Sequence, residues 1–312
     1  MFSLVVPIYN EEYLVDELVL RSVTAIEGFT ADYEIIFVDD GSTDSSLQNL
    51  LLARQKNSRI KVLSLSKNFG HQAAFTAGLE HAVGDTIAMM DGDLQDPPEL
   101  LPGMYNKIHK EDIDIVSGKR IGRTGSRSIR FYTFIFHLLF KNLAGIQNIE
   151  NSGNFSMMNR IALSALLTMH EKVRYMPGLR SFIGFKHDFV EYFREDRKMG
   201  KTKMNLSRLF ILGTDAIFSF SKSPIRLCLL LGIVGTVFFM AAGLYGLIAR
   251  ILDLPLTGWS YTMLSIYFIG SIQLVFMGII GEYVFRIYKE SQGRPIYFVK
   301  KYYSGENSNP QL

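Results

Sequence analysis

Short apolar segments alternate with amphipathic ones along the first 118 residues. Apolar segments of about five residues that end at turn-forming residues predict buried strands, and here they are Phe2–Pro7, Tyr33–Val38, Lys61–Leu65, Thr86–Met90 and Ile113–Ser117. Helical patterns between them include Glu12–Ile26 and Ser45–Gln55, with Ser42 or Asp44 placed to cap the second. This alternation predicts right-handed crossovers and an α/β fold with a mostly parallel, Rossmann-like sheet.

Two much longer apolar segments lie toward the C-terminus. Leu227–Ala249 and Trp259–Gly281 each contain 23 residues and no charge, and a membrane-spanning helix needs about 20. The connector Arg250–Gly258 is short and contains Pro255, which favours a transmembrane hairpin. A pair of buried core helices is the alternative, although uncharged segments of this length are uncommon in soluble domains.

Basic residues near the ends of these segments predict their orientation. Lys222 and Arg226 precede the first segment, while the connector holds one arginine and one aspartate. The residues that follow the second segment include Arg286, Lys289, Arg294, Lys300 and Lys301. By the positive-inside rule both flanks are cytoplasmic. We therefore expect a multi-pass protein of the inner (cytoplasmic) membrane, with its N-terminal domain and both termini in the cytoplasm.

Two further segments have the composition of helices that lie on a membrane surface. Phe131–Leu143 is apolar but too short to span, and it follows Arg123, Arg127 and Arg130. Asn205–Ser221 is similar and follows three lysines. Ordinary core helices with solvated basic caps are the alternative for both. The expected organisation is a cytosolic domain over 1–204 with an interfacial helix at about 125–145, a juxtamembrane helix over 205–226, two transmembrane helices over 227–281 and a cytoplasmic tail over 282–312.

Composition narrows the class of protein. The formal net charge of the 312 residues is only +3, so nothing points to nucleic acid, although Lys119–Lys141 contains six basic residues and no acidic one. Cys228 is the only cysteine, so an intrachain disulfide is excluded, as expected in a reducing cytosol. The N-terminal apolar segment is too short for a signal peptide and reads as the first strand.

Acidic residues follow two of the predicted strands, in Val38–Asp44 (VDDGSTD) and Met90–Pro98 (MDGDLQDPP). Ligands of open α/β sheets bind at the carboxyl ends of the strands, so these residues predict a site for a hard cation, a ribose or a base. Asp91, Asp93 and Gln95 alternate along a segment that we expect to be extended, so their side chains can share one face. An all-oxygen set suits Mg²⁺ or Mn²⁺. A solvated acidic turn is the alternative, with Gln95 as a turn residue.

Four segments in order resemble the family 2 glycosyltransferases of the GT-A fold: Val5–Glu12 (VVPIYNEE), Val38–Asp44, Lys67–His71 (KNFGH) and Asp91–Pro98. With the hairpin and Gly281–Tyr288 (GEYVFRIY), the chain resembles in particular the polyprenyl-phosphate glycosyltransferases, such as bactoprenol glucosyltransferases and dolichol-phosphate mannose synthase-like enzymes. The resemblance covers nearly the whole chain. It implies an inverting, metal-dependent transfer of a sugar from a nucleotide sugar, with UDP as the family expectation, to a polyprenyl phosphate such as undecaprenyl phosphate, for modification of cell-envelope glycans.

The resemblance also implies roles for individual residues. Asp91, Asp93 and Gln95 hold the metal, and Arg197 in Arg197–Lys203 (RKMGKTK) stabilises charge on the diphosphate in the transition state. Asp91, Asp93 and Arg197 thus form the catalytic set. The residues expected to bind the nucleotide sugar are Pro7, Tyr9, Glu11, Asp39, Asp40 and Lys203. Asp39 could instead cap the turn that follows it.

A lipid monophosphate acceptor is already mostly ionised at neutral pH, so it needs positioning cations rather than a general base. The expected lipid-phosphate-binding residues are Arg120, Ser126, Arg127 and Arg130. Arginine suits phosphate because its guanidinium can donate two parallel hydrogen bonds. General attraction of these residues to an anionic lipid surface is the alternative for each of them.

Three features depart from the resemblance or stand outside it. Asn154 occupies a position where many relatives have aspartate, which leaves the sugar open. Gly92 stands where relatives often have alanine, a change that we read as neutral. His71 and His137 lack partners at the spacing of a zinc site or a triad, so we interpret both as structural.

Two other functions compete with this one. A processive polysaccharide synthase uses a Gln-x-x-Arg-Trp segment, whereas the only tryptophan here is Trp259, in the hairpin. A non-catalytic lipid-binding or assembly subunit would explain Asn154 but not Asp91, Asp93 and Arg197. A short membrane hairpin also favours homo-oligomers without specifying one. The sequence names neither the sugar nor the length of the lipid.

Overall fold

The structure is a computed structural model, and it describes residues 1–121, 152–172, 174–193, 223–252 and 259–305. The chain forms two compact units. Unit 1 contains the described residues up to Phe193 and those from Arg294 onward, and unit 2 contains the two long helices between them. We describe each unit by itself.

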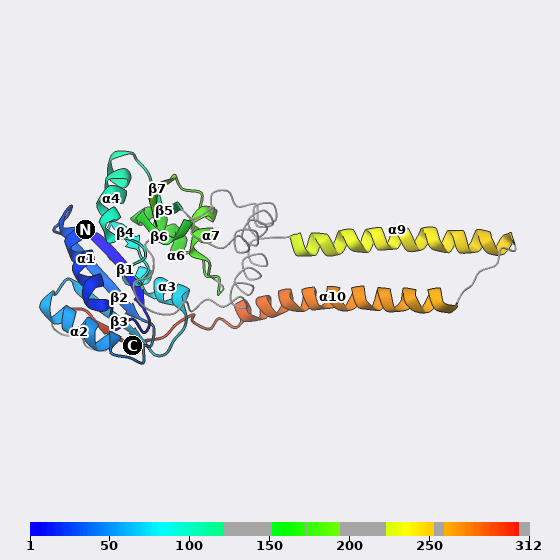
Figure 1. Cartoon of the computed structure of the whole chain (residues 1–312), viewed down its shortest axis with the longest axis horizontal. Coiled ribbons are helices and arrows are strands. Elements are labelled where there is room, and N and C mark those ends of the chain that lie inside the picture. Colours follow the sequence, from blue (N-terminus) through cyan, green and yellow to red (C-terminus); the bar gives the residue numbers. More distant parts are fainter. Residues whose placement is uncertain (122–151, 173, 194–222, 253–258, 306–312) are drawn as a thin grey trace. The chain divides into compact units, whose positions relative to one another are not determined.

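An eight-stranded sheet forms the centre of unit 1 (Figure 1). Its strands are β1 (Phe2–Ile8), β2 (Tyr33–Asp39), β3 (Ile60–Leu65), β4 (Thr86–Met89), β5 (Ile115–Ile121), β6 (Ser152–Asn159), β7 (His187–Phe193) and β8 (Val299–Tyr303), in the order β7-β5-β6-β4-β1-β2-β3-β8. The β1–β2, β1–β4, β2–β3 and β5–β7 pairs are parallel. Strand β6 runs antiparallel to β4 and β5, and β8 runs antiparallel to β3. The predicted mostly parallel α/β sheet is confirmed.

Helices connect and cover these strands: α1 (Val15–Glu27), α2 (Ser46–Lys56), α3 (His71–His81), the 3₁₀ turn η1 (Pro98–Leu100), α4 (Leu101–Lys110), α6 (Arg160–Leu167) and α7 (Met176–Phe182). Helix α3 lies unusually close to the sheet, because a Cβ atom on Gly78 would come within 2.3 Å of the Val5 side chain and 2.9 Å of the Val38 side chain. This close packing brings the first residue of α3, His71, to the carboxyl end of the central strands.

The five strands predicted from the sequence are all present, and their ends either coincide with the predicted ones or differ by at most four residues. Helix α2 begins one residue later than expected and its N-cap residue is Ser45 rather than Ser42 or Asp44. Asp44 nevertheless accepts a hydrogen bond from the Ser46 amide, at 3.0 Å. Strands β6, β7 and β8 were not predicted.

Strand β8 lies in the segment that we expected to be a C-terminal tail. It pairs with the edge strand β3, and the Ser66 amide donates to the Phe298 carbonyl at 2.9 Å. The rings of Phe298 and Phe69 lie 6.1 Å apart. The chain that follows the second long helix therefore forms one edge of the unit 1 sheet.

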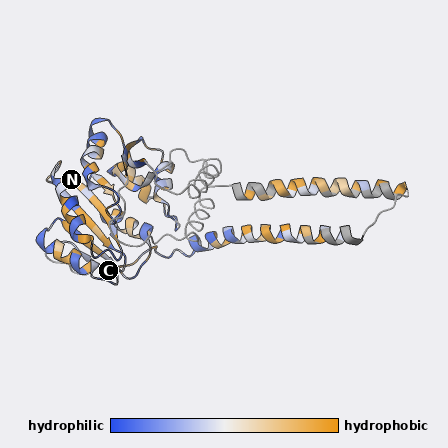
Figure 2. Cartoon of the chain, viewed as in Figure 1, coloured by the Kyte–Doolittle hydropathy of each residue, from blue (hydrophilic) through white to orange (hydrophobic). Residues whose placement is uncertain are grey.

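Unit 2 contains helices α9 (Ser223–Ile251) and α10 (Trp259–Ser291), whose described residues are largely hydrophobic (Figure 2). Many of their apolar side chains are exposed. Within the described residues, one stretch, Phe268–Ser291, is long and apolar enough to cross a membrane, and the apolar stretch Leu230–Ala242 of α9 is shorter. The second predicted span extends further toward the C-terminus than expected, and the two-helix transmembrane hairpin stays a prediction.

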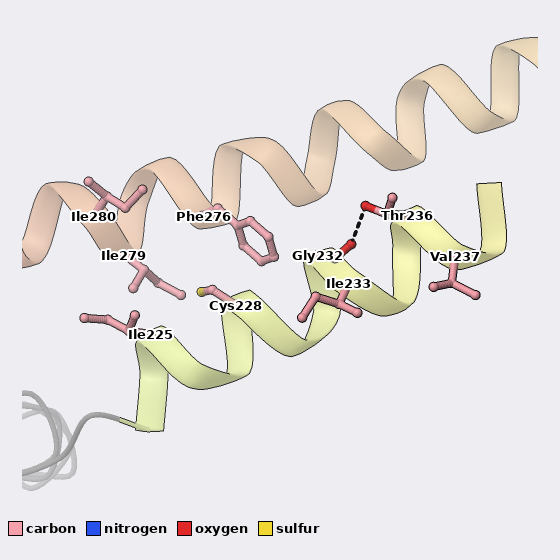
Figure 3. A pocket seen from close by; sticks show the side chains of 9 residues that line it. All are labelled: Ile225, Cys228, Gly232, Ile233, Thr236, Val237, Phe276, Ile279 and Ile280. Carbon is pink, nitrogen blue, oxygen red and sulfur yellow. Dashed lines mark hydrogen bonds between the residues drawn. The ribbon is translucent and has the colours of Figure 1, made fainter. Parts of the chain in front are cut away.

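Apolar side chains from both long helices line a groove between them (Figure 3). Ile225 and Cys228 come from α9, and Phe276 comes from α10. The Thr236 hydroxyl is satisfied within its own helix, since it donates to the Gly232 carbonyl at 2.8 Å. The predicted interfacial helices, Phe131–Leu143 and Asn205–Ser221, lie outside the described residues.

Candidate active site

The carboxyl ends of β1, β2, β3 and β4 lie along one edge of the sheet. Ile8 is opposite Asp39, Asp39 is opposite Ser64, and Val5 is opposite Met89 in the parallel pairing. The loops after these strands, which carry the acidic motifs, therefore meet at one edge, as predicted.

Hydrogen bonds between two of these loops fix the N-terminal motif. The Asn10 amide donates to the Ser42 hydroxyl at 3.1 Å, and the Thr43 amide donates back to the Asn10 side chain at 2.8 Å. The Glu11 amide donates to the Ser46 hydroxyl at 2.9 Å. Asn10 has φ of 53°, a left-handed conformation that asparagine tolerates better than most residues. The Val5–Glu12 and Val38–Asp44 motifs thus form one rigid substructure.

The two adjacent aspartates at the end of β2, Asp39 and Asp40, are buried and hold the loops around them. Asp39 accepts from the Ser42 amide at 3.1 Å and from the Ser64 hydroxyl at 3.2 Å, so it caps the turn. Asp40 is 2 % exposed and accepts from the amides of Phe69 and Gly70 at 2.7 and 3.0 Å. Burial raises the pKa of Asp40, and these amides offset part of the rise. Binding of a base or ribose by either carboxylate stays a prediction.

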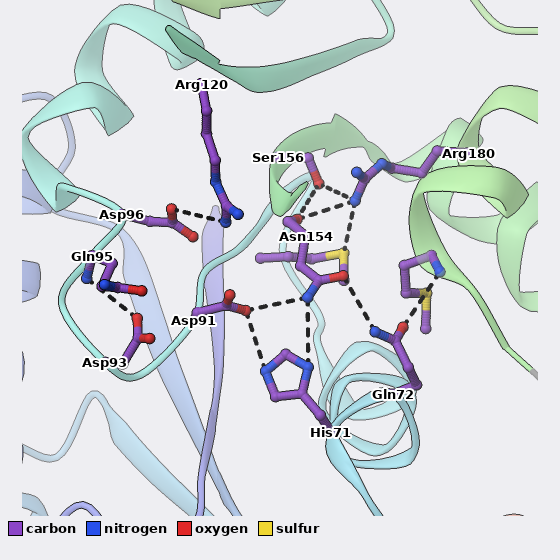
Figure 4. Close-up of polar contacts among 12 residues, drawn as sticks. His71, Gln72, Asp91, Asp93, Gln95, Asp96, Arg120, Asn154, Ser156 and Arg180 are labelled. Atoms are coloured by element: carbon purple, nitrogen blue, oxygen red, sulfur yellow. Dashed lines mark hydrogen bonds and ion pairs between the residues drawn. The ribbon is translucent and has the colours of Figure 1, made fainter. Parts of the chain in front are cut away.

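The Asp91–Pro98 segment differs from the extended conformation that we expected. Strand β4 ends at Met89, and the chain then turns, with Leu94 buried at φ of 57°. Asp93 accepts from the Gln95 amide at 3.2 Å. In Figure 4, Asp93 and Gln95 lie together on this loop, on the side of Asp91 away from His71. The three predicted metal ligands thus share a turn rather than one face of a strand.

Gly92 is not neutral in this turn. A Cβ atom there would lie 2.8 Å from the Pro7 carbonyl oxygen and 2.5 Å from the Ile8 side chain. The absence of a side chain lets the acidic loop approach the end of β1, so our interpretation of this position was wrong.

Asp91 contacts both His71 and Asn154, which also lie close to each other (Figure 4). Its Oδ1 is 3.2 Å from His71 Nε2 and 3.3 Å from Asn154 Nδ2, which donates. Burial raises the pKa of Asp91, but His71 and then Arg120 more than offset it and lower the pKa to about 2. Burial lowers the pKa of His71, but the neighbouring Asp91 carboxylate raises it by more than burial lowers it, so the net change is a rise. His71 is therefore part of the site, contrary to our structural interpretation.

Arg120 anchors the far end of the acidic loop. Its Nε donates to the Tyr192 hydroxyl at 3.0 Å and its Nη2 donates to Asp96 at 3.3 Å, while Tyr192 also donates to the fully buried Asp96. Burial lowers the pKa of Arg120, but Asp96 and Tyr192 raise it more, so the guanidinium stays charged. These contacts anchor the Asp91–Pro98 loop, and lipid-phosphate binding by Arg120 stays a prediction.

The remaining predicted residues divide into described and undescribed ones. Pro7 is buried at the end of β1, Tyr9 is 37 % exposed and Glu11 is partly buried. The residues that lie outside the described part of the chain are Ser126, Arg127, Arg130, Arg197 and Lys203. Their assignments stay predictions.

The donor set around Asp91 fits a hard divalent cation that shares its coordination with a substrate. Within the part of the chain that the structure describes, no group of three or more His, Cys, Asp or Glu side chains could hold a metal ion by itself. Magnesium usually binds through one or two carboxylates and the phosphates of a substrate. Asp91 and Asp93 would supply those two carboxylates.

Comparison with known proteins identifies the family. The family model of glycosyl transferase family 2 matches residues 3–167. An uncharacterized glycosyltransferase of Synechocystis is 36% identical over 299 residues, which are 95% of this chain and 94% of that protein. A prophage bactoprenol glucosyl transferase homolog of Escherichia coli is 35% identical over 302 residues, which are 96% of this chain and 98% of that protein.

A solved structure supports the fold. Glucosyl-3-phosphoglycerate synthase from Mycobacterium tuberculosis, in complex with Mn²⁺, uridine diphosphate and phosphoglyceric acid, has a TM-score of 0.51 at 19% identity and covers 70% of this chain and 76% of that one. The chain belongs to glycosyl transferase family 2 and is a glycosyltransferase.

Proposed function

We propose that this enzyme transfers a sugar from a nucleotide sugar, the UDP-linked form expected from the resemblance, to a polyprenyl phosphate and inverts the anomeric configuration. The observation that carries the proposal is the pair Asp91 and Asp93 in a turn at the carboxyl edge of the sheet. Relatives named bactoprenol glucosyl transferase, which match 96 to 98% of this chain and of their own length, support the acceptor class.

The donor side needs charge stabilisation. When the sugar–phosphate bond breaks, its electron pair moves to the departing nucleotide diphosphate. A divalent cation bound to Asp91 and Asp93, with Gln95 as a further oxygen donor, would neutralise that charge. Arg197 would add a second positive charge at the diphosphate. His71 keeps Asp91 ionised and therefore able to bind a cation.

The acceptor side needs no proton removal. An oxygen of the lipid phosphate, already ionised, attacks the anomeric carbon in line as the bond to the diphosphate breaks. Arg120 together with Ser126, Arg127 and Arg130 would hold the lipid phosphate. The charged guanidinium of Arg120 supports this role for one of the four.

The membrane part of the proposal follows from the long helices. Helix α10 contains the stretch Phe268–Ser291, which is long and apolar enough to cross a membrane. We propose that α9 crosses as well, with the catalytic unit and both termini on the cytoplasmic side, and that the chain can form homo-oligomers. Reporter fusions at the α9–α10 connector and at the C-terminus would test the topology, and an inward connector would overturn it.

A transfer assay on purified membranes tests the activity. Radiolabelled nucleotide sugars are offered one at a time with undecaprenyl phosphate and Mg²⁺ or Mn²⁺, with and without EDTA. We expect one label to enter the lipid phase and to be lost with EDTA and with Asp93→Ala. The matched control is Asp16→Ala, which removes an exposed carboxylate of α1 and should leave transfer unchanged.

Failure of transfer from every donor would overturn the enzymatic proposal. If such a protein still bound the lipid, the non-catalytic lipid-binding subunit would become the better account. Transfer that survives EDTA would overturn only the metal dependence.

A further inference from the structure

Asn154 occupies a position against Asp91 at which the direction of its side-chain amide matters. Its Nδ2 lies 3.3 Å from Asp91 Oδ1, where it donates a hydrogen bond. His71 approaches the same oxygen at 3.2 Å. Within the part of the chain that is described, Asp91 Oδ2 has no hydrogen-bond partner. Two groups thus hold one oxygen of the carboxylate and leave the other open.

The direction of the Asn154 amide is fixed by a chain of hydrogen bonds that starts at the backbone. The Met176 amide can only donate, and it donates to Gln72 Oε1 at 3.3 Å. Gln72 must therefore present its Nε2 group on the other side, where it donates to Asn154 Oδ1 at 3.3 Å. Asn154 in turn must present Nδ2 to Asp91. We call this chain of hydrogen bonds from the Met176 amide through Gln72 and Asn154 to Asp91 the relay. One backbone N–H group sets the direction in which every hydrogen bond of the relay is donated.

The backbone under Asn154 is also held in place. Arg180 is 1 % exposed, and its guanidinium donates to the carbonyls of Gly153 and Asn154 at 2.6 and 3.1 Å and to the Ser156 hydroxyl at 2.8 Å (Figure 4). A buried charged donor with three acceptors resists displacement, because moving it would leave polar groups unpaired. Asn154 cannot easily retreat from Asp91.

We propose that Gln72 and Asn154 are positioning residues, which hold Asp91 through Oδ1 so that Oδ2 is presented to the divalent cation. This inference rests on the proposed function. At position 154 the amide of asparagine, unlike a carboxylate, can donate a hydrogen bond to Asp91.

Binding of Mn²⁺ to the full-length protein in detergent, with UDP present, tests the relay by titration calorimetry or by loss of the free-ion EPR signal. Asn154→Ala removes the donor to Asp91, and we expect Mn²⁺ affinity to fall about 10-fold, as is typical when a partner of a metal ligand is removed. Unfolding temperatures measured alongside show whether each variant is folded.

Gln72→Glu gives the sharper result, because the effect of its added charge and the loss of its hydrogen-bond donor predict opposite changes in Mn²⁺ affinity. A new negative charge near the site should by itself strengthen cation binding. In the relay, however, a carboxylate cannot donate to Asn154 Oδ1, so the Asn154 amide turns that oxygen toward Asp91 and Mn²⁺ binds more weakly. The effect should disappear when Gln72→Glu is combined with Asn154→Ala. Gln55→Glu, which adds the same charge at an exposed position of α2, is the matched control.

Three results would overturn the inference. Wild-type Mn²⁺ affinity in folded Asn154→Ala would show that the amide does not position Asp91. Tighter Mn²⁺ binding by Gln72→Glu, or equal weakening with and without Asn154, would refute the relay while the proposed function stands. No Mn²⁺ binding by the wild-type protein would instead overturn the metal site of the proposed function, and this inference with it.

Discussion

Replacing Asp40 with alanine should lower the unfolding temperature of the protein even when no substrate is present. Its two carboxylate oxygens accept hydrogen bonds from the amides of Phe69 and Gly70, at 2.7 and 3.0 Å, and its side chain is almost completely buried. Asp40→Ala leaves both amides without these acceptors. The carboxylate therefore holds the Lys67–His71 loop, whatever else it binds.

The size of the effect follows from these two contacts. A hydrogen bond to a charged group contributes about 1.5–3 kcal/mol, so two contribute about 3–6 kcal/mol. Burial raises the pKa of Asp40, which shows that ionisation is disfavoured there, so we expect the lower end, about 3 kcal/mol. At about 2–4 °C per kcal/mol, the unfolding temperature should fall by about 6–12 °C. Asp40→Asn keeps one acceptor oxygen and should lose about half as much.

Thermal unfolding of the detergent-purified protein at neutral pH, with EDTA and without nucleotide, measures this loss. Asp16→Ala, at an exposed position of α1, is the control. An unfolding temperature within about 1 °C of wild type for Asp40→Ala would refute the reasoning. Weakened nucleotide binding at unchanged stability would show instead that Asp40 serves the donor.

Three further predictions concern the surroundings of the site. Gly92→Ala should destabilise the protein by about 1–3 kcal/mol and weaken Mn²⁺ binding, because the new Cβ atom would lie 2.8 Å from the Pro7 carbonyl oxygen. Normal Mn²⁺ binding by this variant in titration calorimetry would contradict the prediction. Tyr192→Phe should cost about 1–2 kcal/mol in thermal unfolding, because Asp96 loses a donor. Burial lowers the pKa of His187 from 6.5 to about 4, so stability should fall by about 3 kcal/mol as the pH drops from 6.5 to 4, and His187→Gln should flatten that part of the pH profile.

The central strands and their acidic ends could be predicted because each signal is local. Short apolar segments such as Tyr33–Val38 are buried on both faces in a parallel sheet, and polar residues begin where the strand ends. The position of β4 and the acidic residues after it followed in the same way. The turn at Leu94 could not, because its conformation depends on burial against the rest of the unit.

Contacts between distant segments had no such signal. Asn154 reaches Asp91 because β6 runs antiparallel between β4 and β5, and nothing in the residues of β6 specifies that insertion or its register. His71 reaches Asp91 because α3 packs closely on the sheet at Gly78. The Lys67–His71 motif marked the segment, but only the packing shows which side chain faces the carboxylate.

Strand β8 determines when the sheet of unit 1 can finish folding during synthesis of the protein. The edge strand β3 is paired by residues that follow both long helices, so the ribosome must translate α9 and α10 before the sheet can close. Until then the edge of β3 presents unpaired backbone groups, which is the kind of edge that recruits other chains. A shortened protein that ends before α9 would keep that edge permanently open, so we expect it to aggregate unless residues 294–305 are supplied.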